Sequence, residues 1–182
     1  MDRVEGDQAT GRVARRVRGA RLLARAVVVG VGLALPGVAV AAICASPVER
    51  VAMQVRVLQS DLMVAALICR AKPRYNAFVA RFETDLVRQG TTLNAHFRRV
   101  WGGQSTARLN AFVTRLANQA SARSLSTGGG YCAQVGRVFD EVMALAPVQL
   151  AGYSAIRAER LGVGLPEVCT AEADPSVASG SE

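Results

Sequence analysis

The sequence predicts an all-α fold: a compact bundle of five or six helices, stapled by disulfides and preceded by an N-terminal signal peptide. The first observation is composition. The 182 residues are 51% hydrophobic but only 5% aromatic, and Ala, Val, Leu and Arg dominate, which favours helix over sheet. Apolar residues also recur at helical spacing in successive segments, and no segment alternates like a strand. The third observation is an export signal accompanied by four cysteines.

The N-terminal segment decides the compartment. Seven Arg between residues 3 and 25 precede an uncharged run at 26–48, an order that is typical of a secretory signal peptide. Small residues at Ala39-Val40-Ala41 predict cleavage after Ala41, with cleavage after Ala42 or Ala45 as alternatives. The run also has the roughly 20 residues that a transmembrane helix needs, so a retained anchor is the alternative to cleavage. In both cases the Arg-rich end stays in the cytoplasm and the bulk of the chain lies outside it.

These features divide the chain into three parts. Residues 1–41 are the signal peptide or retained anchor, 42–166 the helical domain, and 167–182 a small, polar tail that we expect to be disordered. The net charge of +8 is shared between the leader and the rest, because seven Arg against three acidic residues give 1–41 a surplus of four. Half of the basicity therefore lies in a segment that cleavage would remove.

The first helix is predicted over 47–70. Ser46 at the N-cap, Pro47 at the first helical position and Glu49 two residues later form a capping box with the favoured proline. Pro73 stops the helix. Between these points an apolar seam recurs at spacings of three and four residues: Val48, Val51, Val55, Leu58, Leu62, Ala65 and Cys69.

The later helices are bounded by glycine, proline and small polar residues. The second helix is predicted over 74–89, stopped by Gly90, and the third is short, capped by Thr91 or Thr92 and ended by Gly102-Gly103. We predict further helices over 105–123 and 131–145, and a sixth that follows Pro147 and extends to Gly162.

The four cysteines are Cys44, Cys69, Cys132 and Cys169, and an even number suits disulfides in an oxidising compartment. If the first helix is continuous, Cys44 and Cys69 lie about 35 Å apart. Disulfide-bonded Cα atoms approach to roughly 6 Å, so this pairing is excluded unless the helix breaks at Ser60-Asp61.

Two connectivities remain. One pairs Cys69 with Cys132 and Cys44 with Cys169; the other pairs Cys69 with Cys169 and Cys44 with Cys132. We favour the first, because Cys69 and Cys132 each lie on the apolar seam of a helix and so point into the same core. Cys44 and Cys169 flank the domain, and the termini of a domain are often close.

No pattern indicates catalysis, a metal or a cofactor. The cysteines are 25, 63 and 37 residues apart, whereas zinc ligands come in closely spaced pairs. The single histidine, His96, is expected to be a partly exposed helical residue and not the partner of a thiolate. The acidic clusters at 83–85 and 140–141 have no apolar setting that would shift a pKa. We therefore expect no catalytic residue, no metal and no cofactor.

Arginines on the helices offer contacts to an anionic surface, either lipid phosphate or nucleic acid, and export argues against nucleic acid. Because Asp and Glu are interspersed, a solvated surface is the simpler interpretation. Trp101, beside a helix stop, is likewise more simply a core anchor than a platform for a ligand. Arg123 could extend the same basic face. The candidate residues for anionic-surface contact are Arg81, Arg88, Arg98, Arg99, Arg108 and Arg115.

Several stretches between residues 58 and 140 carry a resemblance. DLMVAALICR, the following YNAFVARF, LAN-x-x-S at 116–121 and YC at 131–132 resemble a family of small exported helical proteins of Gram-negative bacteria with no assigned function. The resemblance implies export and an all-helical domain. Because these motifs are helix-packing patterns, it implies no catalytic or binding residue.

The sequence therefore favours an exported, non-catalytic protein of the cell envelope with a binding or structural role, located in the periplasm or secreted. The alternative location is the inner membrane, with the domain on the periplasmic side. The alternative function is a peripheral membrane or lipid-headgroup binder that uses an Arg-rich helical face, and an enzyme is the third interpretation. The expected partner is an unidentified envelope protein or a lipid surface, and the oligomeric state stays open.

Overall fold

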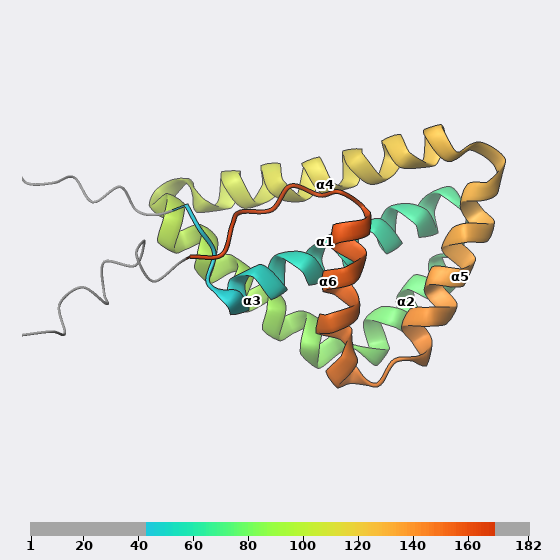
Figure 1. Ribbon diagram of the computed structural model, residues 1–182, viewed down its shortest axis with the longest axis horizontal. Helices are drawn as coiled ribbons and strands as arrows, with labels where there is room; N and C mark the ends of the chain where they lie inside the picture. Colours follow the sequence, from blue (N-terminus) through green and yellow to red (C-terminus); the bar gives the residue numbers. More distant parts are fainter. Residues whose placement is uncertain (1–42, 170–182) are drawn as a thin grey trace, which may run out of the picture. The chain divides into compact units, whose positions relative to one another are not determined.

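A computed structural model describes residues 43–169, which form a helical bundle (Figure 1). The predicted signal peptide, cleavage sites, alternative anchor and the tail from residue 170 lie outside the described residues. The described part contains no strand beyond an isolated parallel bridge between Ala45 and Val168, which confirms the all-α class for this part. Its helices are α1 (Pro47–Ile68), α2 (Lys72–Arg81), α3 (Glu83–Trp101), α4 (Ser105–Thr127), α5 (Tyr131–Ala144) and α6 (Leu150–Arg160), with 3₁₀ turns η1 (Gly102–Gln104), η2 (Gly128–Gly130) and η3 (Pro147–Gln149).

Helix α1 is the centre of the bundle and contacts each of the other five α-helices. Its predicted capping box is confirmed: the Ser46 hydroxyl accepts from the Glu49 N–H at 3.4 Å, and Glu49 Oε2 accepts from the Ser46 N–H at 2.8 Å. The helix ends at Ile68, two residues before the predicted end, and Arg70 then adopts a positive φ of 55°. Four seam positions are buried along its length: Val55, Leu58, Leu62 and Ala65.

Within the described residues, α1 is also the one helix long and apolar enough to cross a membrane by length and composition. However, 61% of its most apolar window is buried inside the protein. Burial of this extent is what a core helix shows, because its apolar side chains are already covered by neighbouring helices.

The division of the chain after α1 differs from the prediction. The structure ends α2 at Arg81 and runs α3 without interruption through Gly90, so the short helix expected to start at Thr91 or Thr92 is part of α3. The two threonines do not cap a helix. Their hydroxyls donate to carbonyls four residues earlier, at 3.1 and 3.2 Å, which is compatible with a continuing helix. The break falls instead at Phe82, a buried residue whose ring lies 5.4 Å from that of Phe78.

The apolar core of the described residues consists of two clusters, and both include residues of α1. The first lies between α1, α2 and α5 and includes Phe78, Phe82 and Phe139. The second lies between α1, α3 and α4 and includes Met53 and Phe112, with Trp101 packed against it. Trp101 therefore contributes to packing, as the sequence analysis expected.

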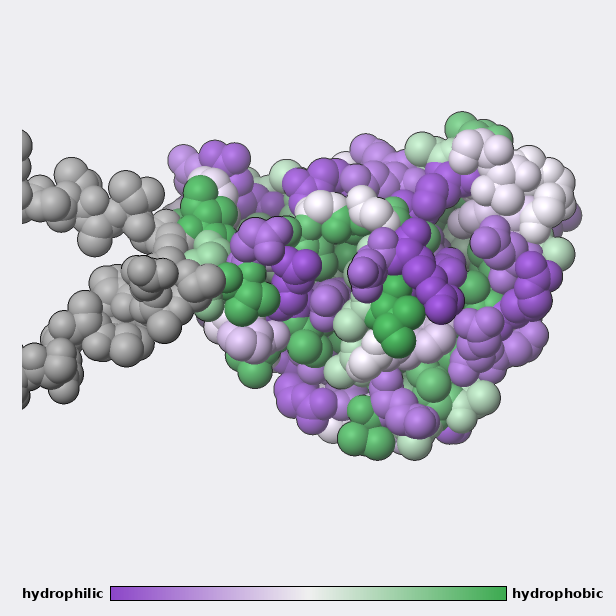
Figure 2. Space-filling model, viewed as in Figure 1, coloured by the Kyte–Doolittle hydropathy of each residue, from purple (hydrophilic) through white to green (hydrophobic). Residues whose placement is uncertain are grey.

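The surface is mixed in polarity. Figure 2 shows hydrophilic residues over much of the visible face, interrupted by separate apolar ones. The large apolar side chains with the greatest exposure belong to different elements: Val148 at 87%, Leu125 at 83%, Val48 at 67% and Val87 at 64%. Single exposed apolar residues are normal for a folded protein.

Candidate functional site

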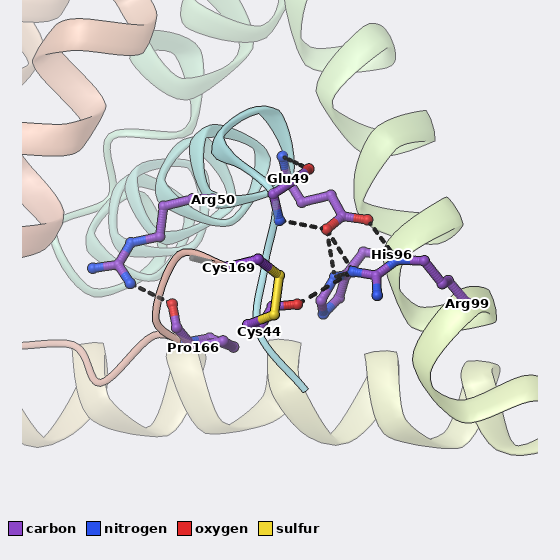
Figure 3. Close-up of a disulfide and its surroundings, with 8 residues drawn as sticks. Cys44, Glu49, Arg50, His96, Arg99, Pro166 and Cys169 are labelled. Carbon is purple, nitrogen blue, oxygen red and sulfur yellow. Dashed lines mark hydrogen bonds and ion pairs between the residues drawn. A yellow bond between two sulfur atoms is a disulfide. The ribbon is translucent and has the colours of Figure 1, made fainter. Parts of the chain in front are cut away.

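The first site is the disulfide between Cys44 and Cys169, whose Cα atoms lie 5.0 Å apart (Figure 3). The segments on either side of it pair like two short strands. Ala45 N–H donates to the Glu167 carbonyl and Cys169 N–H donates to the Ala45 carbonyl, each at 2.9 Å. Residues 167–169, which the sequence analysis assigned to the tail, are therefore part of the folded domain.

A compact ionic cluster lies beside this disulfide (Figure 3). Glu49 accepts hydrogen bonds from Arg99 Nη2 at 2.7 Å and Nε at 3.2 Å, and His96 Nδ1 lies 3.1 Å from Glu49 Oε2. Arg99 also donates to the Cys44 carbonyl at 3.2 Å. Burial raises the pKa of Glu49, but the hydrogen bonds from Arg99, Ser46 and His96 outweigh it and lower that pKa to about 2.

This cluster changes the interpretation of two residues. His96 is 2% exposed and bonded to Glu49, not partly exposed as predicted. The guanidinium of Arg99, a candidate for anionic-surface contact, donates hydrogen bonds to Glu49 and to the Cys44 carbonyl instead. The cluster thus holds α3 against the start of α1.

The second disulfide joins Cys69, which follows α1, to Cys132 in the first turn of α5, with the Cα atoms 5.5 Å apart. All four cysteines of the chain are therefore paired, in the connectivity that the sequence favoured. Helix α1 stays continuous through Ser60-Asp61, which explains why Cys44 and Cys69 cannot meet.

Asp61, inside the apolar run of α1, is the acidic residue of a second ionic cluster. It is 4% exposed, and it accepts from Arg123 of α4 at 2.9 Å and from Arg157 of α6 at 3.1 Å. A charge this deeply buried is tolerated because two guanidinium groups, one on each carboxylate oxygen, compensate its lost hydration.

A pocket of about 340 Å³ opens onto this cluster. We call it the Asp61 pocket; its polar lining residues are Asp61, Arg123, Thr127, Tyr131, Gln134, Arg157 and Arg160. Two buried polar atoms there, the Tyr131 hydroxyl and Arg157 Nε, have no hydrogen-bond partner among the described residues. Burial, and then the negative charge of Asp61, raise the pKa of Tyr131, so its hydroxyl remains a donor at neutral pH.

Of the residues of the Asp61 pocket, sequence reasoning considered only Arg123 for binding, as part of a basic face, and it did not predict the pocket. One local signal was present: Asp61 is a lone acid inside the apolar run VLQSDLMVAAL, where an unpaired charge would be too costly. Its partners lie 62 and 96 residues away along the chain, so the sequence alone did not identify them.

A third feature is the Trp101 pocket, of about 280 Å³, lined by Ile43, Met53, His96, Phe97, Trp101, Arg108, Ala111, Phe112, Arg115 and Pro166. Two of the candidate arginines meet here. The Arg108 guanidinium lies 4.4 Å from the centroid of the Trp101 ring, and that of Arg115 lies 5.3 Å from the centroid of Phe112.

The other candidate arginines lie elsewhere. Arg81, on α2, donates to the Leu145 carbonyl at 2.8 Å. Arg88, on α3, pairs with Asp85 one turn away, and Arg98 is exposed on the same helix. The six candidates are thus spread over three helices, and the structure brings together only Arg108 and Arg115 at one pocket.

In residues 43–169 no group of three or more His, Cys, Asp or Glu side chains is placed to hold a metal ion. Comparisons with protein-family models, with curated proteins and with solved structures found no match to this chain. The resemblance noted from the sequence motifs therefore stays a prediction.

Proposed function

We propose that this chain is an exported, non-catalytic helical protein of the cell envelope that binds another component in the periplasm or outside the cell. One observation carries the proposal: all four cysteines pair, one pair at each end of α1. Disulfides persist in oxidising compartments and are rare in the cytosol, so a fold stapled twice suits a protein that has left the cytoplasm.

The chemistry of the pockets supports binding. Besides Asp61 and His96, their linings offer guanidinium, hydroxyl and amide donors together with aromatic side chains, groups that can hold a ligand in place. The two buried acids, Glu49 and Asp61, are each compensated by hydrogen-bonded arginine. Both carboxylates therefore stabilise the fold, and we do not assign either of them to proton transfer.

Cell fractionation with thiol trapping tests the location. We expect the native protein in the periplasm or the medium, with no cysteine alkylated until a reductant is added. A chain retained through its N-terminal anchor would instead stay in the membrane fraction after alkaline extraction, with its disulfides formed. Recovery from the cytosol with four reactive thiols would refute the proposal.

Recognition of anionic lipid is the second candidate function, and the Trp101 pocket favours it. Arg108 and Arg115 lie there beside apolar and aromatic side chains, a combination that suits a molecule with an anionic head and an apolar body. The spread of the other four arginines argues against a single basic helical face.

Vesicle co-sedimentation tests the second candidate. Arg108→Gln combined with Arg115→Gln should reduce binding to anionic vesicles several-fold, while the control Arg88→Gln, on another helix, should not. Binding should also weaken as salt is added, because screening reduces attraction between exposed charges. Binding that ignores both salt and the double substitution would exclude this candidate.

A further inference from the structure

We infer that the Asp61 pocket is a binding site for a phosphate group, carried either by a free phosphate ester or by a lipid headgroup. The inference rests on the proposed binding function and names its ligand class. It uses residues of four helices, α1, α4, α5 and α6. Of these residues, only Arg123 was considered for binding from the sequence, as part of a basic face.

The charge of the pocket is the first argument. Three guanidinium groups, of Arg123, Arg157 and Arg160, line it with one carboxylate, that of Asp61. Asp61 engages two of the arginines, and Arg160 forms no ion pair within the described residues. The balance is two positive charges, which matches a phosphate monoester, a group that carries between −1.5 and −2 at pH 7.

The second argument is that donors are left over. Tyr131 is 7% exposed, yet within residues 43–169 neither its hydroxyl nor Arg157 Nε has a hydrogen-bond partner. An unsatisfied buried donor costs roughly 1–3 kcal/mol, so two of them at one pocket need an explanation. A phosphate offers several acceptor oxygens and would accept from both.

The start of α5 adds a third contribution. Tyr131 is its first residue, and no side chain caps this end, which follows three glycines. The N-terminus of a 14-residue helix carries a partial positive charge and attracts anions.

A purely structural role would explain less. Asp61 with Arg123 and Arg157 forms a closed ionic cluster that needs neither Arg160 nor the Tyr131 hydroxyl. The pocket volume of about 340 Å³ also lies within the range of small-molecule sites. The arrangement therefore resembles a binding site in which Asp61 orients two arginines.

Calorimetric titration of the full chain with intact disulfides tests the inference, with inorganic phosphate and glycerol 3-phosphate as probes. Arg160→Gln removes an exposed charge and should weaken binding about tenfold, because it removes a charge-assisted hydrogen bond. Tyr131→Phe should weaken it about fivefold. The matched controls are Arg137→Gln, an exposed arginine on α5 that does not line the pocket, and Tyr75→Phe. Neither control should change the affinity.

Vesicles of phosphatidylcholine with and without phosphatidic acid distinguish the two sources. Binding of the soluble probes that Arg160→Gln weakens supports a free phosphate ester. Binding confined to phosphatidic acid vesicles and weakened by the same substitution supports a headgroup. Binding to none of the probes, or binding that Arg160→Gln and Tyr131→Phe leave unchanged, overturns the inference.

The two proposals fail in different ways. A chain that is exported with paired cysteines but binds no phosphate overturns the ligand assignment alone. A chain found in the cytosol with free thiols overturns the proposed function, whatever it binds.

Discussion

At the scale of single residues, two buried acids show how this protein tolerates charge in its core. Glu49 and Asp61 both belong to α1, and each accepts hydrogen bonds from arginine on another helix. Arginine suits this role because its planar guanidinium presents several donors to a carboxylate. Removing either acid leaves a partly buried cation without its partner, and the cost depends on how deeply the pair lies.

Glu49→Gln should lower the free energy of unfolding at pH 7 by about 2 kcal/mol, because a charge-assisted hydrogen bond to Arg99 is lost. The pKa of Glu49 is about 2 in the folded protein, below its ordinary value of 4.5. Because folding lowers the pKa, the ionised Glu49 stabilises the fold fully when the pH is above the pKa of the unfolded chain. This stabilisation is lost as the pH falls from 4.5 towards 2.

Urea unfolding between pH 2 and pH 7 measures this effect. The difference between the wild type and Glu49→Gln should be full at pH 7 and should shrink to nearly nothing at pH 2. Glu159→Gln, at an exposed position, is the control and should stay close to the wild type throughout. A difference that is the same at pH 2 and pH 7 would contradict the assignment.

Asp61→Asn should lower the free energy of unfolding by about 3 kcal/mol, because it leaves the partly buried Arg123 and Arg157 side chains without their counterion. The matched substitution Asp140→Asn breaks an exposed pair with Arg74 and should cost less than about 1 kcal/mol. Thermal unfolding of the two variants separates them. Equal losses would show that the Asp61 cluster contributes no more than a surface ion pair.

At the scale of helices, the prediction that Gly90 ends a helix is wrong, because a glycine ends a helix only where the backbone leaves the helical conformation. In α3 the helix passes through it, and a Cβ placed on Gly90 would meet only Arg56 Nη2, at 3.8 Å. Gly102, at the end of the same helix, is a true terminus with a φ of +50°. Local sequence offers glycine at both positions, and tertiary packing decides between them.

Gly90→Ala should therefore stabilise the protein by about 0.5–1 kcal/mol, since alanine loses less backbone entropy in a helix and the space is open. Gly102→Ala should destabilise it by about 1 kcal/mol, because a Cβ is strained at positive φ. Urea midpoints of the two variants, measured side by side, check the pair. Destabilisation by Gly90→Ala would place the glycine in a role that helix continuity does not explain.

The sequence predicted those features that depend on neighbouring residues. The capping box at Ser46, the seam of α1 and the exclusion of a Cys44–Cys69 bond all follow from spacing along one helix. The Asp61 pocket and the bond from His96 to Glu49 did not follow, because each joins helices that are far apart in the chain. Long-range polar contacts leave no periodic pattern for a sequence to display.

At the scale of the whole described domain, the two disulfides close loops of different size, with sequence separations of 63 and 125 residues. Loop-entropy arguments give about 4 kcal/mol for the smaller loop and slightly more for the larger. Arg50 adds a non-covalent tie between α1 and the C-terminal segment, through the Pro166 carbonyl. The C-terminal segment is thus held to the start of α1 by the Cys44–Cys169 disulfide and by Arg50.

Removing either disulfide should lower stability by about 4 kcal/mol, measured by urea unfolding of Cys69→Ser with Cys132→Ser and of Cys44→Ser with Cys169→Ser. Double substitutions avoid leaving a reactive thiol, which would confuse the result. A double variant with the urea midpoint of the wild type would show that its disulfide does not stabilise the fold.

The two disulfides are also nested, since residues 69 to 132 lie within the interval from 44 to 169. The smaller covalent loop, closed by Cys69 and Cys132, is therefore enclosed by the larger loop, closed by Cys44 and Cys169. A protease that cuts one peptide bond anywhere between Cys44 and Cys169 releases no fragment, because the two pieces stay joined through sulfur. Such a nicked molecule stays in one piece until a reductant reaches it, a property that would suit the exported protein that we propose.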